Sequence, residues 1–139
     1  MIGFSKGLFA FTAILISACA STTPQQTFTN AHGEWSWTLK GTGKTYKGKI
    51  VIVDESEAAY THPGSNGKVL FYSIGDQKDW EGYWVDSTGL YKCAEKKGGS
   101  YYWGIAKMQF NDSYTTFKGV QNRGCQDDGL WIPWEGKRS

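Results

Sequence analysis

The stretch Trp80-Glu81-Gly82-Tyr83-Trp84 contains the pattern that decides the fold: an aromatic residue, any residue, then glycine. The same pattern recurs at residues 46–48, 102–104, 117–119 and 134–136. Residues two apart on a strand point to the same face, so each copy sets a large ring beside a glycine that has no side chain. The ring can cover bare backbone, and the glycine lets the strand bend. Five copies in 139 residues predict a strongly curved antiparallel sheet.

Short alternating segments continue this pattern along the chain. In residues 34–39, for example, Trp35, Trp37 and Leu39 share one face, and polar residues occupy the other. Nine such segments are predicted, at residues 34–39, 45–54, 57–62, 68–74, 80–85, 90–94, 101–110, 115–121 and 130–137. The links are rich in Gly, Asn and Asp, which is typical of hairpin turns. We therefore predict an all-β domain: a small antiparallel up-and-down meander closed or nearly closed into a barrel. An open β-sandwich is the alternative.

The two ends of this predicted domain resemble the calycin pattern of lipocalins and avidins. Gly33-Glu34-Trp35 opens the first segment with G-x-W, and Arg138 follows the last segment. In that pattern the indole packs against a basic side chain from the closing strand. The resemblance therefore implies that Trp35 and Arg138 close the barrel through an indole–cation contact. The stretch 134–138 also resembles the W-x-G-x-R ending of small bacterial β-meander domains. Nothing of the avidin pocket pattern beyond G-x-W is present, so biotin binding is not supported.

The first 18 residues are interpreted as a targeting segment and are not part of the predicted fold. Lys6 precedes an apolar run that suits a secretory signal and is shorter than the roughly 20 residues that span a bilayer. The run ends at Ile16-Ser17-Ala18-Cys19, which resembles the bacterial lipoprotein signal. That resemblance implies a signal peptide over residues 1–18 and a lipid, such as palmitate, on Cys19. The alternatives are a plain signal cleaved near Ala20 and a retained helix.

The residues after Cys19 bear on the membrane and on the domain boundary. In lipoproteins of double-membraned bacteria an Asp directly after the cysteine favours the inner membrane, so Ala20 implies the cell outer membrane with the domain facing the periplasm. Two or more acyl chains hold a protein stably at a membrane. Residues 19–30 are polar and lack an apolar period, so we expect a flexible tether there. The folded domain is predicted over residues 31–139.

Charge and cysteine content restrict the function. The formal net charge is +2 and no basic stripe is present, which does not indicate nucleic-acid binding. With Cys19 assigned to lipid, Cys93 and Cys125 remain, and two cysteines left in a secreted protein predict a disulfide. Such a bond would contribute roughly 3–4 kcal/mol in the chain-entropy model. No CxxC spacing indicates a redox or zinc site.

No group of residues indicates catalysis. His32 and His62 are the only histidines, and both are expected in exposed loops. Asp54, Glu55 and Glu57 could bind a hard cation such as calcium, but a solvated acidic turn explains them more simply. We expect no enzymatic activity, no cofactor and no metal site.

The tryptophans admit two interpretations. Trp37, Trp84, Trp103 and Trp131 can fill a small barrel, because rings bury much area per residue. Some of them can instead line a barrel mouth, where rings stack on a sugar or an apolar ligand. Seven tryptophans exceed what a core of this size ordinarily uses. The candidate binding aromatics are therefore Trp84, Trp103 and Trp131.

The expected function is binding, by a cell-envelope lipoprotein whose ligand the sequence does not identify. One alternative is a protein–protein module, such as a periplasmic inhibitor or assembly factor, which needs a filled barrel and an exposed patch. The other is a lipocalin-like carrier of a small ligand, which needs a hollow barrel. Whether the barrel interior is open or filled distinguishes the two.

Overall fold

The computed structural model describes residues 29–62, 64–126 and 129–139, so the predicted signal peptide and Cys19 lie outside the described residues. A short 3-10 helix, η1 (Thr29–Ala31), precedes eight strands. The strands are β1 (Gly33–Gly41), β2 (Lys44–Ile52), β3 (Glu57–His62), β4 (Ser65–Gly75), β5 (Asp79–Asp86), β6 (Tyr102–Phe110), β7 (Thr116–Asn122) and β8 (Trp131–Arg138). Within these described ranges, no helix is long and apolar enough to cross a membrane.

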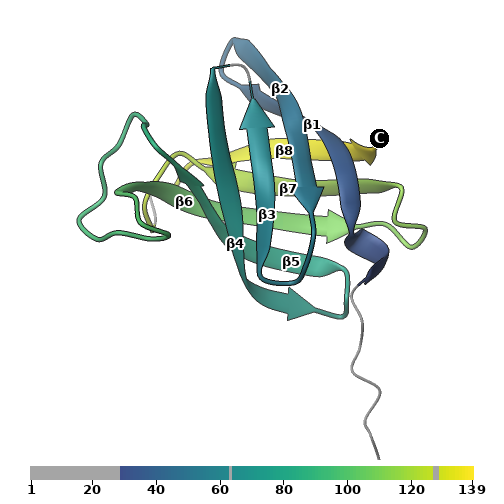
Figure 1. The fold of residues 1–139 in the computed structure, drawn as a ribbon. Coiled ribbons are helices and arrows are strands. Elements are labelled where there is room, and N and C mark those ends of the chain that lie inside the picture. The colour runs from purple at the N-terminus through teal and green to yellow at the C-terminus, as the bar shows by residue number, and fades with distance from the viewer. Residues whose placement is uncertain (1–28, 63, 127–128) are drawn as a thin grey trace, which may run out of the picture.

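Each strand pairs antiparallel with the next, and β1 also pairs with β8, so the sheet closes into a barrel (Figure 1). The closing register sets Trp35 opposite Arg138 and Leu39 opposite Trp134. The predicted all-β up-and-down barrel is confirmed, and the open sandwich is excluded.

The prediction of a strand at residues 90–94 was wrong, because these residues belong to the long connection between β5 and β6. Leu90 is 89% exposed, so the alternation there does not mark a buried face. Cys93 is buried because it is anchored: its N–H donates to the Tyr101 carbonyl at 2.8 Å, and its sulfur bonds to Cys125. Cys93 is thus the one buried residue in this stretch, and its burial comes from these two bonds and not from a strand.

Large side chains fill one half of the barrel. We term this group the core plug; its members are Trp35, Ile50, Trp80, Phe110, Phe117 and Trp134, all at most 2% exposed. Their rings meet at an angle, with centroids 4.9 Å apart for Phe117 and Trp134 and 5.0 Å apart for Trp35 and Phe110. Tilted ring pairs of this kind are favourable. Trp80, Phe110 and Phe117 of the plug belong to strand ends beside the β4–β5 and β6–β7 turns. Figure 1 shows these turns at the same end of the barrel as η1.

The aromatic-x-glycine repeats act across strands. At four of the five motif glycines the ring over the glycine belongs to the residue directly opposite on a neighbouring strand, as Trp134 is to Gly119 and Phe117 is to Gly136, whereas Gly82 meets the backbone of Leu70 and Phe71. A Cβ added at Gly136 would lie 2.0 Å from the Phe117 ring, and one at Gly119 would lie 1.7 Å from the Lys107 carbonyl oxygen. Because ring and glycine are two residues apart on both β7 and β8, the antiparallel register sets each ring opposite the other strand's glycine. The two motifs therefore interlock. The sequence predicted that each ring lies beside a glycine of its own strand. In the structure the ring that covers a glycine instead belongs to a neighbouring strand.

Arg138 and Trp35 meet at the plugged end. The guanidinium carbon of Arg138 lies 4.3 Å from the centroid of the Trp35 ring. The structure therefore brings together the two residues that the calycin resemblance pairs. Gly33 makes room for this contact: its φ is +118°, and a Cβ there would lie 3.0 Å from Nη1 of Arg138. The glycine of G-x-W thus has a physical role in the closure.

The same arginine also holds the chain that leads into β1. Its Nε donates to the Tyr114 carbonyl at 2.9 Å, its Nη1 donates to the His32 carbonyl at 2.6 Å, and its Nη2 donates to the Asn30 carbonyl. Asn30 belongs to η1, within the segment expected to be a tether. These bonds join the start of the domain, the β6–β7 turn and the last strand at one end of the barrel.

Candidate functional site

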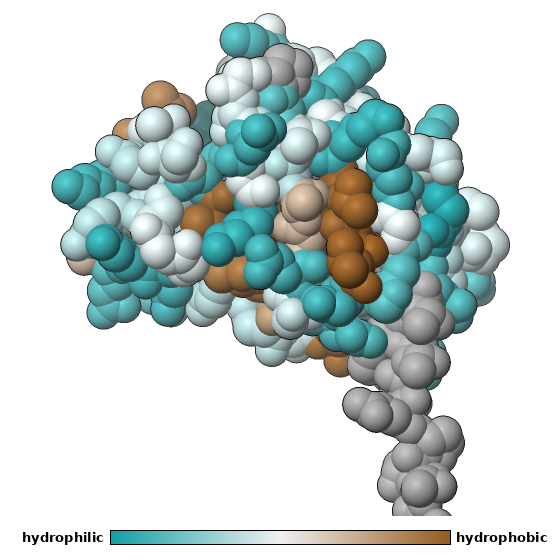
Figure 2. Space-filling model, viewed as in Figure 1, coloured by the Kyte–Doolittle hydropathy of each residue, from teal (hydrophilic) through white to brown (hydrophobic). Residues whose placement is uncertain are grey.

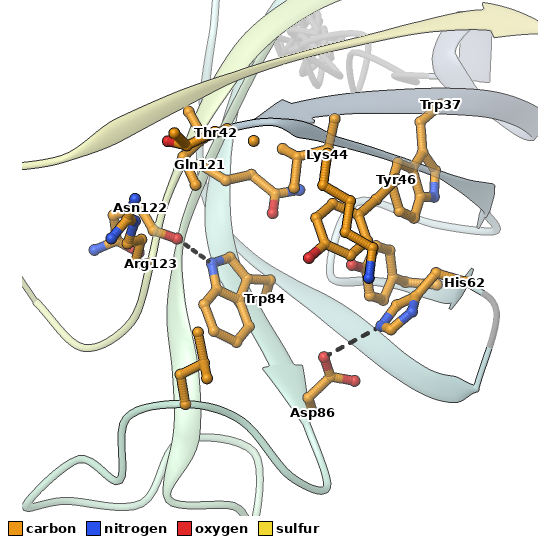
Figure 3. A pocket seen from close by; sticks show the side chains of 15 residues that line it. Trp37, Thr42, Lys44, Tyr46, His62, Trp84, Asp86, Gln121, Asn122 and Arg123 are labelled. Atoms are coloured by element: carbon orange, nitrogen blue, oxygen red, sulfur yellow. Dashed lines mark hydrogen bonds and ion pairs between the residues drawn. The ribbon is translucent and has the colours of Figure 1, made fainter.

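The opposite end of the barrel is not filled. A cavity of about 380 Å³ opens there, between the β1–β2 turn, the ends of β3, β5 and β7, and the start of the β5–β6 connection (Figure 3). We term this cavity the cup. Sites for small molecules in proteins usually have volumes of about 300–1,000 Å³. Trp37, which lines the cup, packs against Trp134 of the core plug with ring centroids 6.4 Å apart, so the plug lies beneath the cup and molecules reach the cup from its mouth.

Aromatic rings make the cup's walls. Trp37 and Tyr60 stack with their centroids 5.2 Å apart and their planes 13° apart. Trp84 also lines the cup, and its indole N–H donates to the Asn122 carbonyl at 3.2 Å. A glycine lies opposite each tryptophan: a Cβ at Gly48 would lie 2.5 Å from the Trp37 ring, and one at Gly104 would lie 2.4 Å from the Trp84 ring. The ring–glycine pairs that shape the barrel therefore also position the walls of the cup.

A histidine–carboxylate pair lies at one side of the mouth. His62 Nε2 is 3.7 Å from Asp86 Oδ2 (Figure 3). The Ser65 hydroxyl donates to Asp86 Oδ1 at 2.7 Å. The serine donates to the carboxylate, whereas the serine of a catalytic triad donates to the histidine. Burial, and then the negative charge of Asp86, raise the pKa of the Tyr60 phenol well above its ordinary value. Tyr60 therefore stays protonated and able to donate at neutral pH.

Gln121 and Asn122 are buried polar side chains on the lining of the cup. Gln121 is the one of the two with an unpaired donor. It is 5% exposed, and its Nε2 has no hydrogen-bond partner among the residues that the structure describes. Figure 3 shows this side chain pointing from β7 into the cup. Both polar atoms of the next side chain, Asn122, are hydrogen-bonded: its Oδ1 accepts from the Ile105 N–H and its Nδ2 donates to the Cys125 carbonyl, both at 2.7 Å. A buried donor left unpaired costs free energy, so the Gln121 amide marks the place where a ligand acceptor would be stabilised.

Two cations reach the mouth of the cup. Lys44 is exposed on the β1–β2 side, with Nζ 5.2 Å from the centroid of the Tyr46 ring, and Arg123 is partly buried after β7. Together with Asp86, they give the lining charged groups of both signs. The cup thus combines apolar ring faces with hydrogen-bond donors and acceptors, the mixture expected of a binding site for a small molecule.

The structure separates the three tryptophans that the sequence suggested for binding. Trp84 lines the cup. Trp103 is 3% exposed outside the barrel, packed with Val85 and Cys93, and its indole N–H donates to the Glu95 carbonyl at 2.7 Å. Trp131 is 39% exposed on the outer surface, with Lys107 Nζ 4.9 Å from its ring centroid. Only Trp84 is therefore placed to contact a molecule in the cup.

Sequence alternation contained the signal that distinguishes these tryptophans. Trp84 is in phase with Gly82 of its own strand, whereas Trp103 and Trp131 are out of phase with the neighbouring motif residues Gly104 and Trp134. Trp37 lies on a strand without such a motif, but it is in phase with Trp35 of G-x-W. Counting in steps of two from each aromatic-x-glycine motif would have selected the inward residues.

Two further expectations concerned histidines and acidic residues. His62 was expected in an exposed loop, but it is the last residue of β3 and lines the cup. Asp54 is occupied by its own turn: its Oδ1 accepts from the Ser56 N–H, the Ser56 hydroxyl and the Glu57 N–H. These bonds lower the pKa of the Asp54 carboxyl. In the described part of the chain, no three His, Cys, Asp or Glu side chains are grouped to hold a metal ion.

The predicted disulfide between Cys93 and Cys125 is present, with Cα atoms 5.4 Å apart. It links the β5–β6 connection to the β7–β8 connection, both at the open end of the barrel (Figure 1). The bond therefore steadies the rim of the cup and leaves the core plug unconstrained.

No protein-family model matches the chain, and neither a curated protein nor a solved structure gives a match. The likeness to calycins thus rests on Gly33, Trp35, Arg138 and the closed barrel itself.

Proposed function

We propose that this chain is a cell-envelope lipoprotein, held in the outer membrane by a lipid on Cys19, whose barrel domain binds a small molecule in the cup and performs no chemistry on it. The observation that carries the proposal is the half-filled barrel, with a cavity of about 380 Å³ above the core plug. The buried, unpaired Nε2 of Gln121 and the ring walls support it.

The open cup favours a small-ligand carrier over a protein–protein module. A protein–protein module requires only a filled interior and a broad exposed patch. Here the interior is open at one end and polar groups point into it. The outer face in Figure 2 is mainly hydrophilic, and its apolar areas are divided by hydrophilic side chains. The molecule's most distinctive surface for binding is therefore the cup.

The position of the chain ends suits a membrane anchor. The chain enters the barrel through η1 at the plugged end, and the cup opens at the β1–β2 turn. Figure 1 shows η1 and the β1–β2 turn at opposite ends of the barrel. A lipid on Cys19 would hold the plugged end toward the membrane. The mouth of the cup would then face the periplasm, where a soluble molecule can reach it.

Ligand-observed NMR tests the proposal. We would reconstitute the full chain in phosphatidylcholine nanodiscs and measure saturation transfer to indole, a flat neutral probe, with empty nanodiscs as the blank. Indole should receive saturation from the wild-type protein and much less from Leu39→Trp, which fills the cup. Lys40→Trp, at the adjacent exposed position of β1, is the matched control. Equal signals from Leu39→Trp and wild type would refute binding in the cup.

A further inference from the structure

We infer that the cup receives the terminal ring of a neutral saccharide, an inference that rests on the proposed function. The argument uses the charges that face the cup, its buried polar groups, its ring walls and its closed floor.

The charges at the cup disfavour a ligand with a full charge. Lys44 and Arg123 lie on its lining together with Asp86, whose side chain is only 12% exposed. An anionic ligand would face the Asp86 carboxylate, and a cationic ligand would face the lysine and the arginine. Asp86 and Arg123 are both partly buried, so a like charge beside either is repelled more strongly than in water, whereas the exposed Lys44 is screened by solvent. A neutral ligand avoids both penalties.

The polar groups call for a ligand with several hydroxyls. The Gln121 Nε2 and the Tyr60 phenol are donors, and the Asp86 carboxylate accepts. A hydroxyl group both donates and accepts, so a polyhydroxylated ring can satisfy groups of each kind. A purely apolar ligand would leave these groups unpaired after excluding water from them, which costs binding free energy.

The ring walls fit the remaining surface of a sugar. A pyranose has a flat face of carbon-bound hydrogens, and such a face packs well on an aromatic plane. Trp84, which is only partly buried, provides such a plane on the lining of the cup, and the nearly buried Trp37–Tyr60 stack supports the wall beside it. Trp84 is fixed by its bond to the Asn122 carbonyl, so little side-chain freedom is lost on binding.

The floor of the cup restricts which ring can enter. Trp80 and Trp134 of the core plug are 1% exposed, so the barrel has no passage to its other end. An internal unit of a long glycan, which continues in both directions, cannot enter such a cavity. A free mono- or disaccharide, or the end of a glycan chain, can.

A glycan array tests the inference. The labelled full chain in phosphatidylcholine nanodiscs would be applied to glycans immobilised by their reducing ends, with methyl glycosides and free disaccharides as soluble competitors. We expect binding to a subset of neutral glycans that share one terminal sugar. Competition by the corresponding free methyl glycoside would show that the ring alone suffices, and competition only by longer glycans would show that a chain end is required.

Three variants identify the site. Gln121→Leu removes the unpaired amide and keeps an apolar body, so it should fold at least as well as wild type while binding falls at least tenfold. Trp84→Ala should show a similar fall. Trp131→Ala removes a ring from the outer surface and should bind as wild type does. Unchanged binding by Gln121→Leu would overturn the inference, because the amide would then not contact the sugar.

Two further outcomes separate this inference from the function it rests on. If no neutral glycan binds, or only charged glycans bind, while indole still receives saturation from the cup, the saccharide inference is overturned and the binding function stands. If neither indole nor any glycan responds to filling of the cup by Leu39→Trp, both are overturned.

Discussion

Replacing Gly119 with alanine tests the interlocking of rings and glycines that shapes the barrel. A Cβ at this position would lie 1.7 Å from the Lys107 carbonyl oxygen and 2.9 Å from the Trp134 Nε1. The first of these contacts is with backbone, which cannot swing away, so β6 and β7 must separate. The same carbonyl accepts the Trp134 indole N–H at 2.9 Å, and that bond would be disturbed as well.

The expected loss of stability follows from these two effects. Overpacking a well-packed interior costs about 1–3 kcal/mol, and weakening a buried hydrogen bond adds about 1 kcal/mol. Gly119→Ala should therefore lower the free energy of unfolding by roughly 2–4 kcal/mol. For a domain of this size that corresponds to a fall in Tm of roughly 8–16 °C.

Thermal unfolding followed by far-UV circular dichroism measures this loss. Gly75→Ala is the matched control, since a Cβ there would meet nothing nearer than 3.7 Å. The control should melt within about 2 °C of wild type, which corresponds to roughly 0.5 kcal/mol. A Gly119→Ala protein that melts with the control would refute the cross-strand account of the repeats.

Three further changes test other parts of the molecule. Arg138→Lys loses the stacked guanidinium and part of its carbonyl contacts, so the free energy of unfolding should fall by about 1–2 kcal/mol; Lys137→Ala, at the adjacent exposed position, should have little effect, and equal stability of the two variants would contradict the closure. The double change of Cys93 and Cys125 to alanine should cost roughly 3–4 kcal/mol, and a loss in urea unfolding below about 1 kcal/mol would show that the bond constrains little. Cys19→Ala should release the protein from the membrane fraction of cells, whereas unchanged fractionation would exclude the lipid anchor.

Much of the fold could be predicted from the sequence because it depends on local patterns. The period of two in residues 34–39 and the five aromatic-x-glycine copies indicate strands, and the glycine-rich links indicate hairpins. G-x-W at Gly33 and the late Arg138 point to the closure through a resemblance. Residues 90–94 were predicted as a strand but lie in the β5–β6 connection, where the Cys93–Cys125 disulfide and the Cys93 N–H bond to the Tyr101 carbonyl hold the chain, and the local sequence does not reveal these constraints.

The cup was harder to predict because it depends on which strands face one another. Tyr60 stacks on Trp37 because β1 and β3 both flank β2, and Trp84 lies over Gly104 through the β5–β6 register. Gln121 is an ordinary polar residue in the sequence, and its importance follows only from its burial on β7. These relations are long-range, and no single stretch of the chain specifies them.

The seven tryptophans allow the most direct test of the cup. Each indole N–H gives its own signal in a ¹H–¹⁵N spectrum of the full chain in nanodiscs, and single Trp→Phe changes assign the signals. On titration with indole, the Trp37 and Trp84 signals should shift together, while those of Trp103 and Trp131 stay in place. Shifts confined to Trp103 or Trp131, with Trp37 and Trp84 unmoved, would contradict the account and place binding on the outside of the barrel.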